Sequence, residues 1–314
     1  MPATPPIDTD VETTPVTERM RVRRFALPAF ALLVLALAAA LLGFGLGEYR
    51  GKRAVASKQL QVTVVNVGHG EAAWVRTPGG RFVLLGGGPP EAGRAVVESL
   101  RRAGAERIDL LLLPYPYAES LGGIPAILRA FPVDKVLEPG GPAINQLHDE
   151  VRRQLAAKQT PVLRVRAGDQ QRLDGVAIDI LAPTDPAIEV SPAAANNSLV
   201  VRIGWGQTGF LFAGGTERAG EDALIARGSP LLASDWLRIS RFGTREASSP
   251  ELLRLVSPDF VVLSVGAQNS GGYPHAETLQ RLSASGAAVY RTDQALRTEI
   301  SFTSDGAAVV AVPG

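Results

Sequence analysis

Three observations in the 314-residue sequence predict an α/β protein whose mixed sheet is covered by helices. Segment 61–67 alternates and is rich in β-branched residues, and two further strand patterns follow at 72–77 and 81–85. The run 110–113 is continuously apolar and ends at a proline, which is typical of a strand buried on both faces. Beyond this run, strand patterns alternate with helical ones, as expected of a sheet with helices packed on it.

The amino-terminal residues predict a membrane anchor. Residues 1–24 form a polar tail that ends in four arginines. Residues 25–47 carry no charge and would span about 34 Å as a helix, enough to cross a bilayer. A linker at 48–58 then leads to one globular domain, 59–314. We expect a single-pass protein with its domain outside the cytoplasm, and a cleaved signal peptide is the alternative.

The remaining elements follow from local signals. A Pro-Gly-Gly turn after 72–77 is typical of a hairpin, and Ser249 before Pro250 is typical of a helix start. The expected helices are 92–104, 121–131, 143–158, 216–227, one that begins near 249–250, and 274–284. The expected strands are 107–113, 135–137, 176–182, 198–204, 208–213, 236–240, 260–265, 287–290 and 297–303.

The loop after the buried strand resembles a known metal-binding loop. α/β proteins place their chemistry in loops at the carboxyl ends of such strands. Residues 114–123 resemble the Thr-His-Pro-His-Ala-Asp-His-x-Gly-Gly loop of the metallo-β-lactamase fold. The proline, alanine and both glycines of that loop are kept, as Pro116, Ala118, Gly122 and Gly123. Its three histidines fall on Tyr115, Tyr117 and Ser120, and its aspartate falls on Glu119.

The resemblance extends over residues 60–312 and is strongest to the soluble domain of the ComEC competence proteins. The Asn-Asn-x-Ser-Leu-Val stretch of that domain is kept at 196–200, and its Asp-Val-Gly-Gln-Gly-Asp stretch is altered at 66–71. Its Ile-Asp-Gly-Gly and Leu-Thr-Gly-Asp stretches become 85–88 and 212–215. Its His-His-Gly-Ser and Gly-His-Pro-His stretches become 241–244 and 272–275. The resemblance implies a four-layer αβ/βα sandwich and a hydrolase that uses zinc or manganese.

The residues at the implied metal site predict a catalytically degenerate protein without a metal cofactor. The resemblance places Tyr115, Tyr117, Glu119, Ser120, Gly215, Arg241, Phe242 and His275 at or near that site. Only Glu119 and His275 among them coordinate metals readily, whereas a hydrolytic zinc site needs about three protein ligands. We therefore expect no catalytic residues and no metal-dependent hydrolysis. An active metallo-hydrolase with an atypical site, a nuclease or phosphodiesterase, is the alternative.

The same pocket has groups that favour an anion. Arg241, His275 and the backbone amides of Gly86, Gly87 and Gly88 are expected to bind a small anionic or phosphate-bearing ligand. The alternative for Arg241 is a salt bridge with Glu119. A protein partner is equally compatible with a binding or scaffold role.

The charge balance argues against a broad nucleic-acid surface. The chain has 32 basic and 31 acidic residues, and residues 1–53 hold seven and five of them. Subtraction leaves 25 basic and 26 acidic residues, a net charge of about −1, which gives no general attraction for a polyanion. A DNA-uptake accessory protein that grips DNA without cutting it remains a further hypothesis.

Overall fold

The computed structural model describes residues 59–141, 144–267, 269–294, 299–303 and 310–312. The predicted tail, membrane segment and linker, residues 1–58, lie outside this part of the chain. Within the described residues, no helix is both long and apolar enough to cross a membrane.

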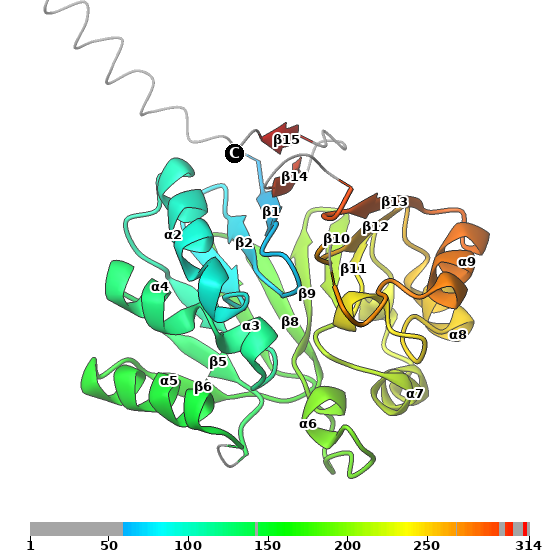
Figure 1. The fold of residues 1–314 in the computed structure, drawn as a ribbon, viewed down its shortest axis with the longest axis horizontal. Coiled ribbons are helices and arrows are strands. Elements are labelled where there is room, and N and C mark those ends of the chain that lie inside the picture. Colours follow the sequence, from blue (N-terminus) through cyan, green and yellow to red (C-terminus); the bar gives the residue numbers. More distant parts are fainter. Residues whose placement is uncertain (1–58, 142–143, 268, 295–298, 304–309, 313–314) are drawn as a thin grey trace, which may run out of the picture. The chain divides into compact units, whose positions relative to one another are not determined.

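Two mixed sheets pack face to face (Figure 1). The first has the order β15-β14-β1-β2-β3-β4-β5-β6 and the second the order β13-β12-β11-β10-β9-β8-β7. The strands of the first sheet are β1 (Gln61–Val65), β2 (Ala73–Arg76), β3 (Phe82–Leu85), β4 (Leu110–Leu112), β5 (Val136–Glu138), β6 (Val162–Arg164), β14 (Glu299–Thr303) and β15 (Val310–Val312). Those of the second are β7 (Gln170–Leu173), β8 (Val176–Ala182), β9 (Val200–Trp205), β10 (Thr208–Phe212), β11 (Trp236–Arg238), β12 (Phe260–Leu263) and β13 (Ala288–Arg291).

Helices cover the outer face of each sheet, so the predicted four-layer arrangement is confirmed for the described residues (Figure 1). The α-helices are α2 (Gly93–Arg102), α3 (Ala118–Leu121), α4 (Ile124–Ala130), α5 (Gln146–Ala157), α6 (Ala193–Asn196), α7 (Arg218–Arg227), α8 (Pro250–Val256) and α9 (Ala276–Ala284). Three 3-10 helices are η1 (Pro90–Ala92), η2 (Pro230–Leu232) and η3 (Arg241–Gly243).

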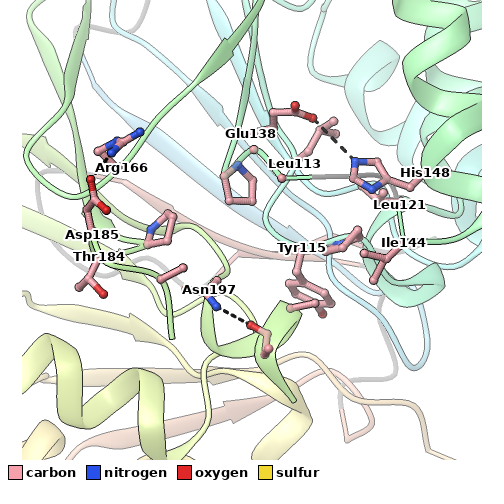
Figure 2. Close-up of a pocket in the computed structure, with 18 residues that line it drawn as sticks. Leu113, Tyr115, Leu121, Glu138, Ile144, His148, Arg166, Thr184, Asp185 and Asn197 are labelled. Atoms are coloured by element: carbon pink, nitrogen blue, oxygen red, sulfur yellow. Dashed lines mark hydrogen bonds and ion pairs between the residues drawn. The ribbon is translucent and has the colours of Figure 1, made fainter. Parts of the chain in front are cut away.

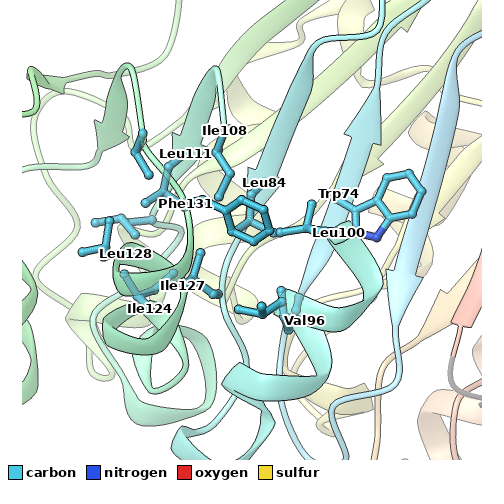
Figure 3. Packing of buried hydrophobic residues seen from close by; sticks show 14 of the residues in the cluster. Trp74, Leu84, Val96, Leu100, Ile108, Leu111, Ile124, Ile127, Leu128 and Phe131 are labelled. Atoms are coloured by element: carbon cyan, nitrogen blue, oxygen red, sulfur yellow. The ribbon is translucent and has the colours of Figure 1, made fainter. Parts of the chain in front are cut away.

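The apolar strands are continuous in sequence because both of their faces are buried. In β4, Leu110 and Leu112 join the core between the sheets, while Leu111 faces the helices. Successive strand residues point to opposite faces, so a strand between two apolar layers needs apolar residues at every position. Figure 3 shows the apolar cluster between this sheet and its helices, to which Trp74 belongs. The indole Nε1 of Trp74 donates to Ser99 Oγ at 2.7 Å.

The predicted elements are confirmed in kind among the described residues, with some local differences. The helix expected at 121–131 is two short helices, α3 and α4, separated by the Gly122-Gly123 pair. Strands β6, β7 and β15 were not predicted, and neither were the short helices α6, η2 and η3. Strands β6 and β7 are short, and their residues are partly or fully exposed, so they carry no alternating apolar pattern. The start expected near Ser249 is confirmed, since Ser249 Oγ accepts from Leu252 N at 3.3 Å.

Candidate functional site

Loops from both sheets meet at one end of the sandwich. In the first sheet these loops are 66–72, 86–89 and 113–117, which follow β1, β3 and β4. In the second sheet they are 213–217 and 239–244, which follow the parallel strands β10 and β11. All five leave the carboxyl ends of their strands, which is where α/β sheets form ligand sites. We call the cluster of side chains at this junction the polar site.

Glycines bring the backbones of these loops into close contact. A Cβ atom on Gly123 would lie 2.0 Å from the carbonyl oxygen of Gly87, and one on Gly86 would lie 2.5 Å from that of Glu71. Gly86 also has a φ of +68°, which disfavours any residue with a side chain. Gly87 and Gly123, which match the family pattern, and Gly86, which stands where that pattern has aspartate, therefore all serve backbone packing in this chain.

The same packing corrects the expected anion site at the glycine loop. The amide of Gly86 donates to Leu112 O at 3.0 Å, that of Gly87 to Ser120 O at 2.7 Å, and that of Gly88 to Glu71 O at 2.8 Å. All three N–H groups are thus committed to backbone carbonyls. They are not available to an anion while the loop keeps this conformation.

The ring of Tyr115 lies against Gly215. Tyr115 is 1% exposed, and a Cβ on Gly215 would lie 3.0 to 3.3 Å from three atoms of its ring. The family pattern has histidine and aspartate at these two positions. The tyrosine therefore extends into the space at which an aspartate side chain would begin, so the two departures from the pattern are sterically matched.

Beside Tyr115, a buried ion pair joins the two sheets. Arg238 Nη1, on β11, donates to Glu71 Oε1 at 2.5 Å, and both side chains are less than 5% exposed. Burial raises the pKa of Glu71, against the opposing attraction of Arg238. Burial and then the charge of Glu71 raise the pKa of Tyr115 well above its usual range. The phenol of Tyr115 therefore stays protonated at neutral pH.

The polar site contains several buried polar atoms without a hydrogen bond of normal geometry. They include Glu71 Oε2 and the neighbouring Tyr115 hydroxyl, together with Arg238 Nη2, Ser120 Oγ and His69 Nδ1. Buried polar atoms in folded proteins normally have a partner, and ordered water commonly supplies it. The described part of the chain thus concentrates unmet hydrogen-bonding capacity at this junction.

Arg241 pairs with a carboxylate that the sequence did not indicate. Its Nε lies 3.1 Å from Glu217 Oε1, and its guanidinium lies 5.9 Å from the Tyr117 ring centroid. Burial raises the pKa of Glu217, and Arg241 opposes this shift. The alternative of a salt bridge for Arg241 is correct in kind, but the partner is Glu217 where Glu119 was expected. Glu119 lies in the first turn of α3.

His275 and Phe242 belong to an aromatic cluster at the edge of the polar site. The His69 ring lies 3.8 Å from Phe242 and 5.4 Å from Tyr273, and the Tyr273 ring lies 5.0 Å from His275, between centroids. Burial lowers the pKa of His69, Glu119 opposes the shift and Arg241 adds to it. His275 is the N-cap residue of α9, but its side chain makes no cap hydrogen bond.

The kept Asn-Asn-Ser stretch has structural roles here. Asn196 Oδ1 accepts from the amides of Glu217 and Gly220 at the start of α7. Asn197 bonds both backbone groups of Ile188, and Ser198 Oγ accepts from Gly215 N at 2.8 Å. The bonds of Asn196 and Ser198 hold loop 213–217 in place beside Tyr115.

The side chains at the polar site do not fit a zinc or manganese centre. The described residues contain no group of three or more His, Cys, Asp or Glu side chains able to hold a metal ion. Glu71 is already bonded to Arg238, and Gly215 offers no carboxylate. A metal ion would also lie near the fixed charges of Arg238 and Arg241. That the protein binds no metal stays a prediction for direct measurement.

Sequence reasoning placed most of this site but missed its centre. The predicted residues Tyr115, Tyr117, Glu119, Ser120, Gly215, Arg241 and Phe242 do converge, with His275 at the edge. Arg238, Glu217 and the role of Glu71 were missed. A signal for Arg238 was present, because a charged residue inside the apolar run 236–239 is unusual for a buried strand.

Sequence comparison finds relatives among competence proteins. No protein-family model matches the chain. The chain is 29% identical over 278 residues to "Competence protein ComA" of Neisseria gonorrhoeae, which covers 83% of this chain and 37% of that protein. It is 26% identical over 250 residues to "Recombination protein 2" of Haemophilus influenzae, and this alignment covers 78% of this chain and 29% of that protein. The chain therefore spans little more than a third of these relatives at most.

Structural comparison finds the same fold in proteins of low sequence identity. The metallo-β-lactamase fold protein YhfI of Bacillus subtilis matches 78% of this chain and 99% of its own, with a TM-score of 0.51 and 12% identity. The diiron β-hydroxylase CmlA of Streptomyces venezuelae matches 77% and 54%, with a TM-score of 0.51 and 16% identity. The chain thus has the metallo-β-lactamase fold, and its sequence is similar to those of ComEC-type competence proteins.

Proposed function

We propose that this domain is a non-hydrolytic metallo-β-lactamase-type domain with a binding or scaffold role. The observation that carries the proposal is the buried pair of Glu71 and Arg238 beneath Tyr115. A hydrolytic site of this fold needs a cation and an open position for water. In this chain Arg238 supplies the positive charge, and the Tyr115 ring occupies the space next to Gly215 in which the family pattern has an aspartate side chain.

Metal analysis and a phosphodiesterase assay test this proposal together. The purified full-length chain is incubated with zinc or manganese, dialysed, analysed for metal, and assayed with bis(p-nitrophenyl) phosphate. We expect well under one metal ion per chain and no hydrolysis above background, because Glu119 and His275 alone do not complete a site.

Two variants and a matched control make the assay decisive. Glu119→Gln and His275→Asn remove the two potential ligands, while Glu106→Gln makes the same charge change as Glu119→Gln at an exposed position in the loop between α2 and β4. Stoichiometric metal together with hydrolysis that falls in the first two variants but not in the third would overturn the proposal. That result would establish the atypical hydrolase instead.

We further propose that residues 25–47 anchor the protein in the membrane, with the domain outside the cytoplasm. The support is the uncharged length of this segment. The chain has no cysteine, so Ala157→Cys introduces a single thiol at an exposed position. A membrane-impermeant maleimide should label it in intact cells, and a chain lacking 25–47 should leave the membrane fraction. Labelling only after lysis would reverse the orientation.

A second candidate role is in DNA uptake without cleavage, and the similarity to competence protein ComA favours it. Deletion of the gene in its source organism should then lower the frequency of transformation by added DNA. A Glu119→Gln gene should restore uptake as fully as the unaltered gene, because this role needs no hydrolysis. An unchanged frequency after deletion would remove this candidate.

A further inference from the structure

A cavity of about 370 Å³ lies beside the polar site. It opens at the carboxyl ends of the parallel strands β4, β5 and β6, between α5 and the loop that leads into α6. Its size falls within the range of small-molecule sites, roughly 300–1,000 Å³. Tyr115 is part of its wall, so the cavity adjoins the polar site without sharing the Glu71–Arg238 pair.

Most of the cavity wall is apolar. Leu113, Leu121 and Ile144 come from the first sheet's side, and Pro183 and Ala194 come from the segment after β8. Figure 2 shows Ile144, Leu121 and His148 on one side of the cavity and Thr184 and Asp185 on the other. Ile144 is 48% exposed and places apolar surface at the opening.

One side of the wall carries the buried carboxylate of Glu138, whose negative charge is compensated by a neighbouring arginine. Glu138 is 4% exposed and accepts from Arg152 Nη2 at 2.8 Å, and Oε2 of the same carboxylate lies 3.8 Å from His148 Nε2. Burial alone would raise the pKa of Glu138, but His148 and Arg152 together lower it. The carboxylate is therefore charged at neutral pH, and Arg152 compensates that charge.

His148 has a free acceptor. The residue is 6% exposed and lines the cavity, and its Nδ1 is buried without a hydrogen bond. In the neutral imidazole whose proton is on Nε2, toward the Glu138 carboxylate, Nδ1 carries a lone pair and is an acceptor. A buried acceptor of this kind costs free energy until a donor meets it.

The opening of the cavity does not select for charge. Arg166 and Asp185 form an ion pair there, and both side chains are more than 60% exposed. Asn197 also lines the cavity, but its amide already bonds Ile188 and Ala193. The Tyr115 hydroxyl lies next to Glu71 at the polar site. Of the lining side chains away from that site, His148 therefore has the unpaired atom that would orient a bound molecule.

We propose that this cavity binds a small, uncharged, mainly apolar molecule that donates one hydrogen bond to His148 Nδ1. The hydroxyl or amine of an aromatic or alicyclic compound fits this description. Ligand binding in this cavity does not depend on whether the neighbouring polar site hydrolyses phosphodiesters, so it is independent of the proposed function.

Ligand-observed ¹⁹F NMR on the full-length chain tests the proposal with two probes of similar shape. 4-Fluorophenol has a donor, and 4-fluoroanisole lacks one. We expect 4-fluorophenol to bind about three- to tenfold more tightly, the ratio that one hydrogen bond supplies. Ala194→Phe, which fills the cavity, should abolish binding of both probes. Ala157→Phe makes the same change at an exposed position outside the cavity and should leave both affinities unchanged.

Variants of His148 test the orientation. His148→Phe should lower the affinity for 4-fluorophenol to that for 4-fluoroanisole, whereas His148→Asn, which keeps an acceptor near the Nδ1 position, should retain the preference. Ala194→Phe leaves His148 in place, so the test stands even if His148→Phe fails to fold. The proposal fails if neither probe binds at millimolar concentration, if both bind equally, or if Ala194→Phe binds as the unaltered chain does.

Discussion

The glycine loops and the side-chain positions of the polar site depart from the metallo-β-lactamase pattern to very different degrees. Gly87, Gly88, Gly122 and Gly123 are retained, and a Cβ at each would come within 3 Å of another atom. Tyr115 and Gly215 have changed as a matched pair, and Glu71 is bonded to Arg238. Close backbone contacts require glycine whether or not a metal is bound. Side chains at a metal site are required only for metal binding, so other side chains can replace them once that role is lost.

The largest expected effect comes from breaking the buried ion pair. Arg238→Met should lower the free energy of unfolding by about 3–5 kcal/mol, because it leaves Glu71 buried without its partner. Urea unfolding of the full-length chain, followed by tryptophan fluorescence, measures this. The double variant Glu71→Leu with Arg238→Met should recover most of the loss. Arg218→Met, at an exposed ion pair, should cost less than about 1 kcal/mol. An equally small cost for Arg238→Met would contradict the role given to the pair.

The next effect tests whether the glycine frame is a packing requirement. Gly123→Ala should cost about 3 kcal/mol, because the added methyl group would lie 2.0 Å from the Gly87 carbonyl oxygen. Gly104 has a φ of +87° but open space around it, so Gly104→Ala should cost only the backbone strain, about 1–2 kcal/mol. Thermal unfolding of both variants compares them. A larger cost for Gly104→Ala than for Gly123→Ala would contradict the packing role of Gly123.

A smaller effect tests the matched pair at the polar site. Gly215→Asp should cost about 2 kcal/mol, because its side chain would start against the Tyr115 ring. The same substitution in a Tyr115→His background should cost clearly less, since the smaller ring leaves room. A double-mutant cycle of unfolding free energies gives the coupling. Equal costs in the two backgrounds would show that these positions are independent.

The smallest effect is a pH dependence at the aromatic cluster. Burial lowers the pKa of His69 from its ordinary value of 6.5, so below pH 6.5 the unfolded chain binds a proton that the folded chain resists. Stability from this group is present above pH 6.5 and is lost as the pH falls toward the lower folded-state pKa. His69→Phe keeps the ring contacts and removes the titration. The unaltered chain should therefore lose more stability than the variant between pH 7.5 and 5.5 in urea unfolding. A parallel loss in both would argue against this role.

The sequence was informative where a pattern was local and repeated. The apolar run 110–113 indicated a doubly buried strand, and Ser249-Pro250 indicated a helix start, because both depend on neighbours in the chain. The exposed edge strands β6 and β7 left no such pattern. The partner of Arg238 lies 167 residues away, and one sequence carries no record of such a pairing. Most residues that line the cavity beside Tyr115 lie in loops, and hydrophobic periodicity does not predict where loop side chains are placed.

The Glu71–Arg238 contact has a consequence for how the molecule comes apart. Glu71 belongs to a loop of the first sheet and Arg238 to a strand of the second. A fluctuation that separates the two sheets would break this ion pair and leave the charges of Glu71 and Arg238 without partners in an apolar environment. The ion pair therefore raises the free energy that is needed for either sheet to open independently of the other. Slow amide hydrogens on both sheets should accordingly exchange in a single all-or-none event.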